Sequence, residues 1–155
     1  MRLYRIAPAR FIADLTGEGA RLAGGRWNPK GVPALYTAES AALALLEYLA
    51  RVTLADLPAD LSLAVLEVME PCALLTITSA ELPPGWDTPS VARATMELGR
   101  QWFETAPTPA LRVPSVLLPP GLGWNIILNP RHPALNLALI EILPLQIDKR
   151  LEYPA

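Results

Sequence analysis

Proline is the residue type that most limits what this chain can fold into. Seventeen of the 155 residues are proline, spread along the whole length, and nine are glycine. Proline has no backbone N–H and disrupts helix interiors and central strands, so such a chain is divided into short elements joined by turns. The 52% hydrophobic and 18% charged content fits a globular protein and excludes a disordered chain. We therefore expect one α+β domain over residues 1–155, with short mixed or antiparallel strands and a few helices.

Hydrophobic periodicity predicts two helices. One is expected to run from Thr37, as its N-cap, to about residue 52, and the other from Thr88-Pro89 to about Glu104. The predicted buried stripe of the first helix consists of Leu45, Leu46, Leu49 and Val52. Strands are predicted at Leu3–Ile6, Ala34–Tyr36, Leu61–Val68, Leu74–Thr78, Leu111–Leu118, Asn125–Leu128 and Leu139–Leu145. No G-x-G-x-x-G or G-x-x-x-x-G-K-[ST] sequence occurs, which argues against a Rossmann domain and a P-loop enzyme.

The charge balance and the rare residue types exclude several kinds of site. Thirteen basic and fifteen acidic residues give a net charge of −2, which provides no overall basic field for direct binding of DNA or RNA. The one cysteine, Cys72, excludes an internal disulfide and a C-x-x-C metal site. The one histidine, His132, argues against a histidine-based zinc site.

The sequence predicts neither a signal peptide nor a membrane span. Four charged residues within the first 14 positions interrupt any apolar signal region. The most apolar later stretch, residues 134–147, contains Asn136, Glu141 and Pro144 and is shorter than the ~20 residues that cross a bilayer. We expect a soluble cytoplasmic protein without a membrane partner.

Glu47 is the first polar residue that stands out against its surroundings. On a helix its neighbours at i−4, i−3 and i+3 are Leu43, Ala44 and Ala50, all apolar. A carboxylate on an apolar helix face is a candidate for a functional group. The alternative is an ion pair with Arg51, four residues further on, on a solvated face.

A second candidate is the segment from Gly24 to Asn28, Gly-Gly-Arg-Trp-Asn. Two glycines allow the backbone to approach a ligand closely, and Arg26 and Trp27 then provide a guanidinium group for a phosphate or carboxylate and a ring for stacking. The alternative is a glycine turn with Trp27 in the core.

Three further residues stand out near the C-terminal half. Ser115 lies in an apolar run without the G-x-S-x-G elbow of a hydrolase, so a ligand hydrogen bond or a plain strand serine is favoured over a nucleophile. Asn125 opens an apolar strand. His132 lies between two prolines at a turn, a position that favours a structural role.

The order of these motifs resembles the RES domain family, which is named for an arginine, a glutamate and a serine that recur in it. The resemblance extends over nearly the whole chain, although residues 52–86 match only loosely. The matching segments are Leu3–Ile6, Gly19–Asn28, Gly31–Ala38, Ala42–Glu47, Gly99–Trp102, Val113–Ser115 and Asn125–Pro133.

The resemblance implies a fold similar to that of ADP-ribosyltransferases and a role as the toxin of a bacterial toxin–antitoxin pair. Members of the family deplete NAD by splitting the nicotinamide–ribose bond, with water or phosphate as the acceptor. NAD is then the substrate, and neither a separate cofactor nor a metal ion is expected. The implied partner is an Xre-like helix-turn-helix antitoxin, which would make any contact with DNA.

Matched position by position, the family's arginine, glutamate and serine fall on Arg26, Glu47 and Ser115, and its tyrosine falls on Tyr36. In these roles Glu47 stabilises the positive charge that develops on the ribose, Arg26 holds the diphosphate or a ribose, and Tyr36 stacks on nicotinamide. The expected catalytic residues are thus Glu47, Arg26, Tyr36 and Ser115. The expected NAD-binding residues are Arg5, Arg26, Trp27, Asn28, Tyr36 and Asn125.

The chain departs from the family pattern at Arg51, where many relatives carry histidine. This departure keeps the Glu47–Arg51 ion pair open as an alternative. Two other functions also stay open at this point: transfer of ADP-ribose to a protein, and a catalytically silent module that only binds its partner.

Overall fold

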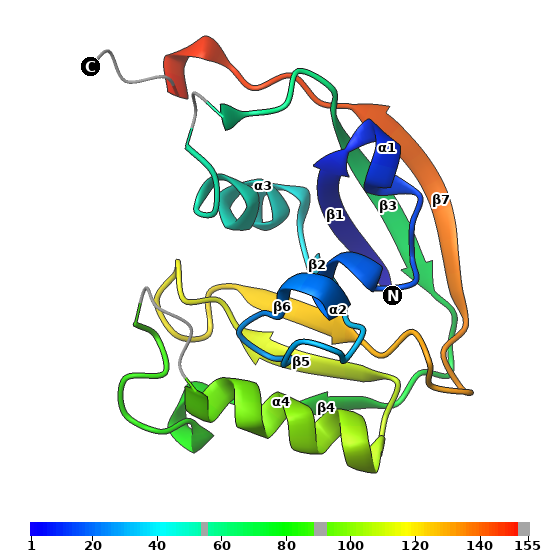
Figure 1. Cartoon of the computed structure of the whole chain (residues 1–155), viewed down its shortest axis with the longest axis vertical. Helices are drawn as coiled ribbons and strands as arrows, with labels where there is room; N and C mark the ends of the chain where they lie inside the picture. Colours follow the sequence, from blue (N-terminus) through cyan, green and yellow to red (C-terminus); the bar gives the residue numbers. More distant parts are fainter. Residues whose placement is uncertain (54–55, 89–92, 152–155) are drawn as a thin grey trace.

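Seven strands form one sheet in the computed structural model of the protein, which describes residues 1–53, 56–88 and 93–151 (Figure 1). The strands are β1 (Arg2–Pro8), β2 (Leu35–Ala38), β3 (Leu61–Val68), β4 (Leu74–Thr76), β5 (Ala110–Pro114), β6 (Trp124–Leu128) and β7 (Leu137–Pro144). Their order is β4-β5-β6-β2-β1-β3-β7, and all neighbours are antiparallel except β4 and β5, which are parallel. The α+β class with short mixed strands is confirmed.

The sheet divides into two halves between β1 and β2. Within the halves pairing is extensive: β1 pairs with β3 at seven positions and β2 pairs with β6 at four. Between the halves, β1 and β2 are in register at one position, Tyr4 with Ala38. In Figure 1 β1, β3 and β7 lie at the upper right and β4, β5 and β6 lie below, so the two halves splay apart on either side of β2.

The described residues contain four α-helices: α1 (Ala9–Ile12), α2 (Glu18–Ala23), α3 (Ala41–Leu49) and α4 (Arg93–Thr105). The short helices α1 and α2 were not predicted, whereas α3 and α4 correspond to the two predicted helices. The described part of the chain also includes the 3-10 helices η2 (Ser79–Glu81) and η3 (Lys149–Leu151). None of the helices in the described ranges is long and apolar enough to span a membrane.

Helix α3 begins three residues later than predicted. Thr37, the predicted N-cap, belongs to β2, and its hydroxyl donates to a main-chain carbonyl of β6 at 2.7 Å. The N-cap is Ser40, whose hydroxyl accepts the N–H of Leu43 at 3.1 Å. The buried face also differs, because Leu43 and Ala44 are buried and Leu46 is exposed. The predicted buried stripe was therefore wrong. The buried face of α3 is the one that contains Leu43 and Ala44, and Glu47 lies on this side.

The ends of several strands differ from the prediction. β5 ends at Pro114 and does not continue to Leu118, because the N–H of Ser115 bonds the carbonyl of Gly123 and the chain turns there. β4 is shorter and β7 begins two residues earlier than expected. β3 has the predicted bounds. The second helix was predicted to start at Thr88-Pro89, and Pro89 lies outside the described residues.

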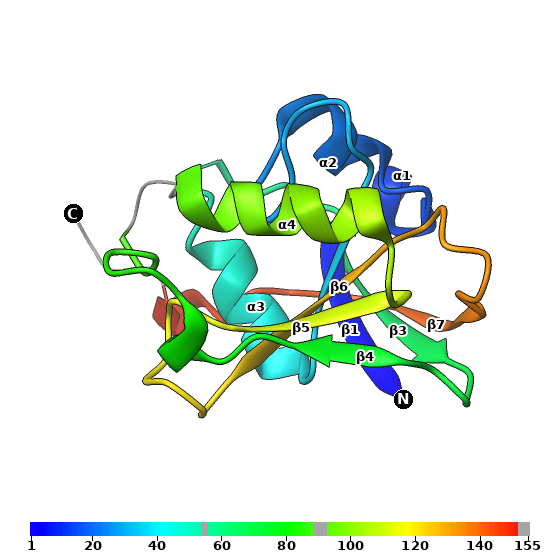
Figure 2. The same ribbon diagram turned by 90° about the horizontal axis from the view of Figure 1, so that it is seen from below.

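The helices cover the sheet through separate groups of apolar side chains. Figure 2 shows α4 lying along the half that contains β4, β5 and β6. There Trp102 packs with Leu111, Val113 and Ile127 of the sheet and with Trp27 of the loop after α2. α3 packs against β1 through a smaller group of side chains, which includes Ala38, Leu43 and Ala44 with Tyr4 and Ile6.

The contact between α4 and the loop after α2 generates a stability prediction. A Cβ atom at Gly99 would lie 1.8 Å from the carbonyl oxygen of Trp27, so α4 or the loop would have to move. We expect Gly99→Ala to lower the free energy of unfolding by at least ~1–3 kcal/mol, measured by urea denaturation.

Gly19→Ala is the matched control, because Gly19 is also helical and a Cβ there meets no atom within 4 Å. Its stability should be unchanged or higher by about 0.5–1 kcal/mol. Equal stability of Gly99→Ala and the wild type would contradict the described packing of α4.

Candidate active site

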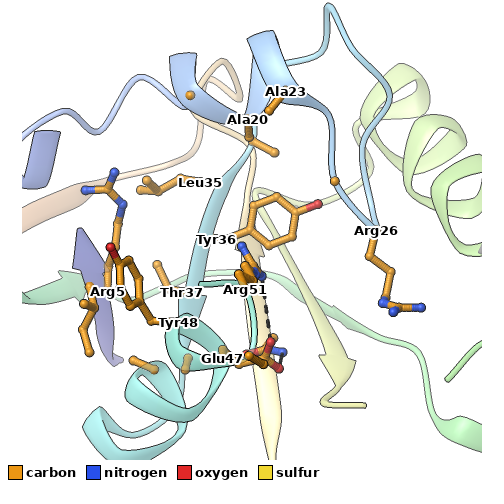
Figure 3. Close-up of a pocket in the computed structure, with 18 of the residues that line it drawn as sticks. Arg5, Ala20, Ala23, Arg26, Leu35, Tyr36, Thr37, Glu47, Tyr48 and Arg51 are labelled. Atoms are coloured by element: carbon orange, nitrogen blue, oxygen red, sulfur yellow. Dashed lines mark hydrogen bonds and ion pairs between the residues drawn. The ribbon is translucent and has the colours of Figure 1, made fainter. Parts of the chain in front are cut away.

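A pocket of about 750 Å³ opens between the two halves of the sheet, with walls from β1, β2, α2 and α3 (Figure 3). Its volume is within the range of roughly 300–1,000 Å³ that is typical of small-molecule sites. The pocket follows from the single register position between β1 and β2, since residues of both strands line the opening. The sequence-predicted site residues that line it are Arg5, Arg26, Tyr36, Glu47 and Asn125.

Glu47 lies on the pocket-facing side of α3, with a side chain that is only 16% exposed. Its Oε1 accepts hydrogen bonds from the hydroxyl of Ser115 at 2.8 Å and from the side-chain amide of Asn125. These donors account for a carboxylate among apolar neighbours, because a buried charge needs hydrogen-bond partners. The ion pair with Arg51 also exists, at 3.8 Å from Oε2, but Glu47 does not lie on a solvated face.

Ser115 and Asn125 reach Glu47 from the sheet. Asn125 belongs to β6 and lines the pocket, while Ser115 follows β5 and is almost fully buried. The single hydroxyl hydrogen of Ser115 is donated to Glu47, and its oxygen accepts the N–H of Leu117 at 3.1 Å. In the structure Ser115 therefore holds the carboxylate and does not face the pocket, which differs from the ligand contact expected from the sequence.

Tyr36 presents its ring to the pocket and is anchored by its hydroxyl. The hydroxyl donates to Oδ1 of Asn28 at 2.8 Å and accepts the main-chain N–H of Trp27 at 3.0 Å. Burial raises the pKa of Tyr36 to about 12, so the phenol is neutral at physiological pH. Gly25 permits this arrangement, because a Cβ there would lie 2.5 Å from the tyrosine oxygen.

Trp27 and Asn28 support the loop from inside the protein. Trp27 is 2% exposed in the core, and Asn28 is fully buried. The amide nitrogen of Asn28 donates to the carbonyls of Ala20, Pro29 and Val32. Both residues were predicted to bind NAD; in the structure they shape the loop that carries Arg26, which agrees with the turn interpretation for Trp27.

Arg26 lies at the opposite side of the pocket from α3 (Figure 3). Its guanidinium group donates to the carbonyl of Trp86 at 2.6 Å and to that of Thr88 at 2.8 Å. Partial burial lowers the pKa of Arg26, while the negative charge of Glu47 opposes this shift. The guanidinium group of Arg26 is thus held in place by the two carbonyls of the segment before α4.

Arg5 on β1 lines the pocket as well, but its guanidinium group is turned to α1. It donates to the main-chain carbonyls of Phe11 at 3.1 Å and of Ile12 at 2.8 Å. Burial lowers the pKa of Arg5. Both bonds leave from Nη1, so the other N–H groups of Arg5 are not used by α1, and its role in binding NAD stays a prediction.

The structure also adds residues that the sequence analysis did not assign to the site. Tyr48 on α3 and Asp87 near the mouth line the pocket. Tyr48 directly follows Glu47, and its separation of four residues from the apolar Ala44 was the sequence signal that could have found it. Asp87 has no comparable signal, because its place depends on the contact between Arg26 and the segment before α4.

His132 lies outside the pocket. Its Nδ1 accepts the N–H of Ala134, and its Nε2 is 3.1 Å from the carbonyl oxygen of Ala106, as the structural interpretation requires. Across residues 1–53, 56–88 and 93–151, no group of three or more His, Cys, Asp or Glu side chains is arranged to hold a metal ion.

Comparison with known proteins identifies close relatives of the whole chain. The chain is 36% identical to a protein named Toxin Res from Yersinia enterocolitica, over 98% of this chain and 100% of that protein. It is 38% identical to the Prs ADP-ribosylating toxin of Sphingobium sp., over 77% of this chain and 74% of that protein.

A solved structure has the same fold. A chain of the M. tuberculosis MbcT–MbcA toxin–antitoxin complex superposes with a TM-score of 0.69 at 23% identity, over 93% of this chain and 83% of that chain. The model of the RES domain matches residues 2–153. Since this match and the full-length relatives cover almost every residue, the chain belongs to the RES domain family.

Proposed function

We propose that the protein is the toxin of a toxin–antitoxin system, and that it cleaves the nicotinamide–ribose bond of NAD in the cytoplasm of the cell that makes it. The family match and the relatives named Toxin Res support the toxin role. The structural neighbour, a chain of a toxin–antitoxin complex, has the same fold. The chemistry of the pocket supports the proposed reaction.

The observation that carries the proposal is the fixed carboxylate of Glu47. Cleavage of a glycosidic bond gives the ribose oxocarbenium character. A carboxylate that is already oriented, here by Ser115 and Asn125, stabilises that positive charge without reorganising at the moment of reaction. The bond between ribose and nicotinamide breaks with its electron pair going to the ring nitrogen, and an oxygen of water or phosphate forms the new bond to the same ribose carbon.

The other pocket residues bind and orient the substrate in this proposal. Tyr36 offers its ring face to nicotinamide, since its hydroxyl is engaged by Asn28 and Trp27. Arg26 still has N–H groups beyond the two bound to carbonyls, and these suit the diphosphate. Ser115 and Asn125 act as positioning residues for Glu47. NAD is the substrate, and the reaction so described uses no metal ion and no further cofactor.

A second candidate function is transfer of ADP-ribose to a protein, which the name of the Sphingobium relative favours. Purified protein mixed with NAD distinguishes the candidates through free nicotinamide and labelled protein. Nicotinamide release without labelling supports hydrolysis or phosphorolysis, and labelling of an added protein supports transfer. If the protein neither releases nicotinamide nor labels a protein, the result supports the catalytically silent binding module.

Glu47→Gln tests whether the charge of the Glu47 carboxylate is needed for the reaction. The amide keeps an oxygen that can accept from Ser115 and Asn125, so the fold should persist while the charge is lost. We expect nicotinamide release to fall about 10²–10³-fold, as for the loss of one electrostatic stabiliser. Glu104→Gln, on the exposed surface of α4, is the control and should leave the rate unchanged. A Glu47→Gln variant with more than half the wild-type rate would rule out this role.

Arg26→Lys tests the guanidinium fork. Lysine keeps the charge but cannot hold two carbonyls and a phosphate in one plane. We expect the affinity for NAD, measured by calorimetry, to fall about tenfold or more. Arg21→Lys, in an ion pair with Glu18 on α2, is the matched control. Unchanged NAD affinity in Arg26→Lys would remove this residue from the ligand contacts.

The partner proposal follows from the same site. A protein that destroys NAD must be inhibited in its own cell, so we expect an Xre-like helix-turn-helix antitoxin to cover the pocket mouth near Arg26. The product of the neighbouring gene should co-purify with this chain and abolish nicotinamide release. With a net charge of −2 the chain alone should not retard promoter DNA in a gel. A stable complex with full activity would contradict coverage of the site.

A further inference from the structure

Three guanidinium groups line the pocket, and they differ in the hydrogen-bond partners that they have within the protein. Arg5 and Arg26 each donate two hydrogen bonds to main-chain carbonyls. The side chain of Arg51 is 61% exposed, and its Nη2 lies 3.8 Å from Oε2 of Glu47. Its guanidinium carbon lies over the ring of Tyr36, 5.5 Å from the ring centre. Among the described pocket arginines, Arg51 is therefore the one whose side-chain N–H groups are not bound to main-chain carbonyls.

The ion pair with Glu47 does not explain why Arg51 lies here. A separation of 3.8 Å exceeds the roughly 2.7–2.9 Å of a charge-assisted hydrogen bond, so the exposed Arg51 forms no hydrogen bond to the mostly buried Glu47. The carboxylate is already oriented by Ser115 and Asn125 through its other oxygen. Arg51 can therefore turn to a ligand without releasing Glu47 from its position.

The charges around Tyr36 favour an anionic ligand at this wall. The positive charges of Arg51 and Arg26 both act to lower the pKa of Tyr36, against the larger opposite effect of burial, so both fields reach the same region. Arg51 stands beside Glu47 and offsets the repulsion that the carboxylate would exert on an approaching phosphate.

Besides Asp87 near the mouth, two further carboxylates line the pocket, and these two lie near α2 and have partners of their own. Asp14 accepts hydrogen bonds from the N–H and the hydroxyl of Thr16. Glu18 is paired with Arg21 at 2.6 Å. Neither pairing involves Arg51, so its guanidinium group is not committed to these acids.

We propose that Arg51 binds a phosphate group at the pocket wall between Tyr36 and Glu47. The inference rests on the proposed function, which offers two sources of phosphate: the diphosphate of NAD and inorganic phosphate as the acceptor. In the second case a phosphate oxygen bonds to the ribose carbon as the C–N bond breaks and its electron pair goes to the nicotinamide nitrogen. The products are then nicotinamide and a phosphorylated ADP-ribose.

Calorimetry without turnover tests the binding step. Inorganic phosphate and an uncleavable NAD analogue that keeps the diphosphate are titrated separately into the wild type, Arg51→Gln and Arg51→Lys at constant ionic strength. We expect at least one of the two ligands to bind Arg51→Gln about tenfold more weakly, as for the loss of one charge-assisted hydrogen bond, with Arg51→Lys between. Arg150→Gln, an exposed residue paired with Asp148 outside the pocket, should bind like the wild type. Wild-type affinity of Arg51→Gln for both ligands, at an unchanged melting temperature, would overturn the proposal.

Steady-state kinetics distinguish the two sources of phosphate. If the ligand is the acceptor, phosphate accelerates nicotinamide release in a saturable manner, and Arg51→Gln loses this response. If it is the diphosphate of NAD, Arg51→Gln raises KM at constant kcat and added phosphate competes with NAD. A wild type that releases no nicotinamide would refute the proposed function, while the calorimetric comparison would still decide whether Arg51 binds phosphate.

Discussion

The fold depends on how short the pairing between β1 and β2 is. β1 is paired along its length with β3 on one side, yet it is in register with β2 at only Tyr4 and Ala38. A sheet paired fully at this point would leave no space between its halves, because neighbouring strands lie about 4.8 Å apart. The opening instead becomes a pocket lined by residues of both strands, while each half of the sheet is held by its own ladder of hydrogen bonds.

Helix α3 bridges the two halves of the sheet and carries the carboxylate. It follows β2 directly in the sequence, and its buried Leu43 and Ala44 pack with Tyr4 and Ile6 of β1. Glu47, one turn further on, is then brought within hydrogen-bond distance of β6 and of the residue after β5. Side chains far apart in the sequence fix one carboxylate oxygen, so the orientation of Glu47 is a property of the whole fold.

Patterns among residues close together in the sequence predicted the elements that such patterns determine. The alternation of Leu61–Val68 gave the bounds of β3, and the apolar neighbours of Glu47 pointed to its unusual position. The cap at Ser40 was missed because Thr37 is an equally good capping residue, and only its pairing with β6 excludes it. The hydrogen bond between Ser115 and Glu47 spans 68 residues, and no spacing rule connects them. The resemblance to a family supplied both residues, but not the contact between them.

The contacts of Arg26 set a condition on any ligand that enters the pocket. Its guanidinium group already donates one N–H each to the carbonyls of Trp86 and Thr88, so a ligand meets the N–H groups that these two bonds leave over. A neutral group offers the arginine no more than these carbonyls do, whereas a phosphate oxygen forms a stronger, charge-assisted bond. Under the proposed function, the loop after α2 would thus select ligands by their charge, and molecules that carry only the sugar or the ring of NAD would bind there more weakly.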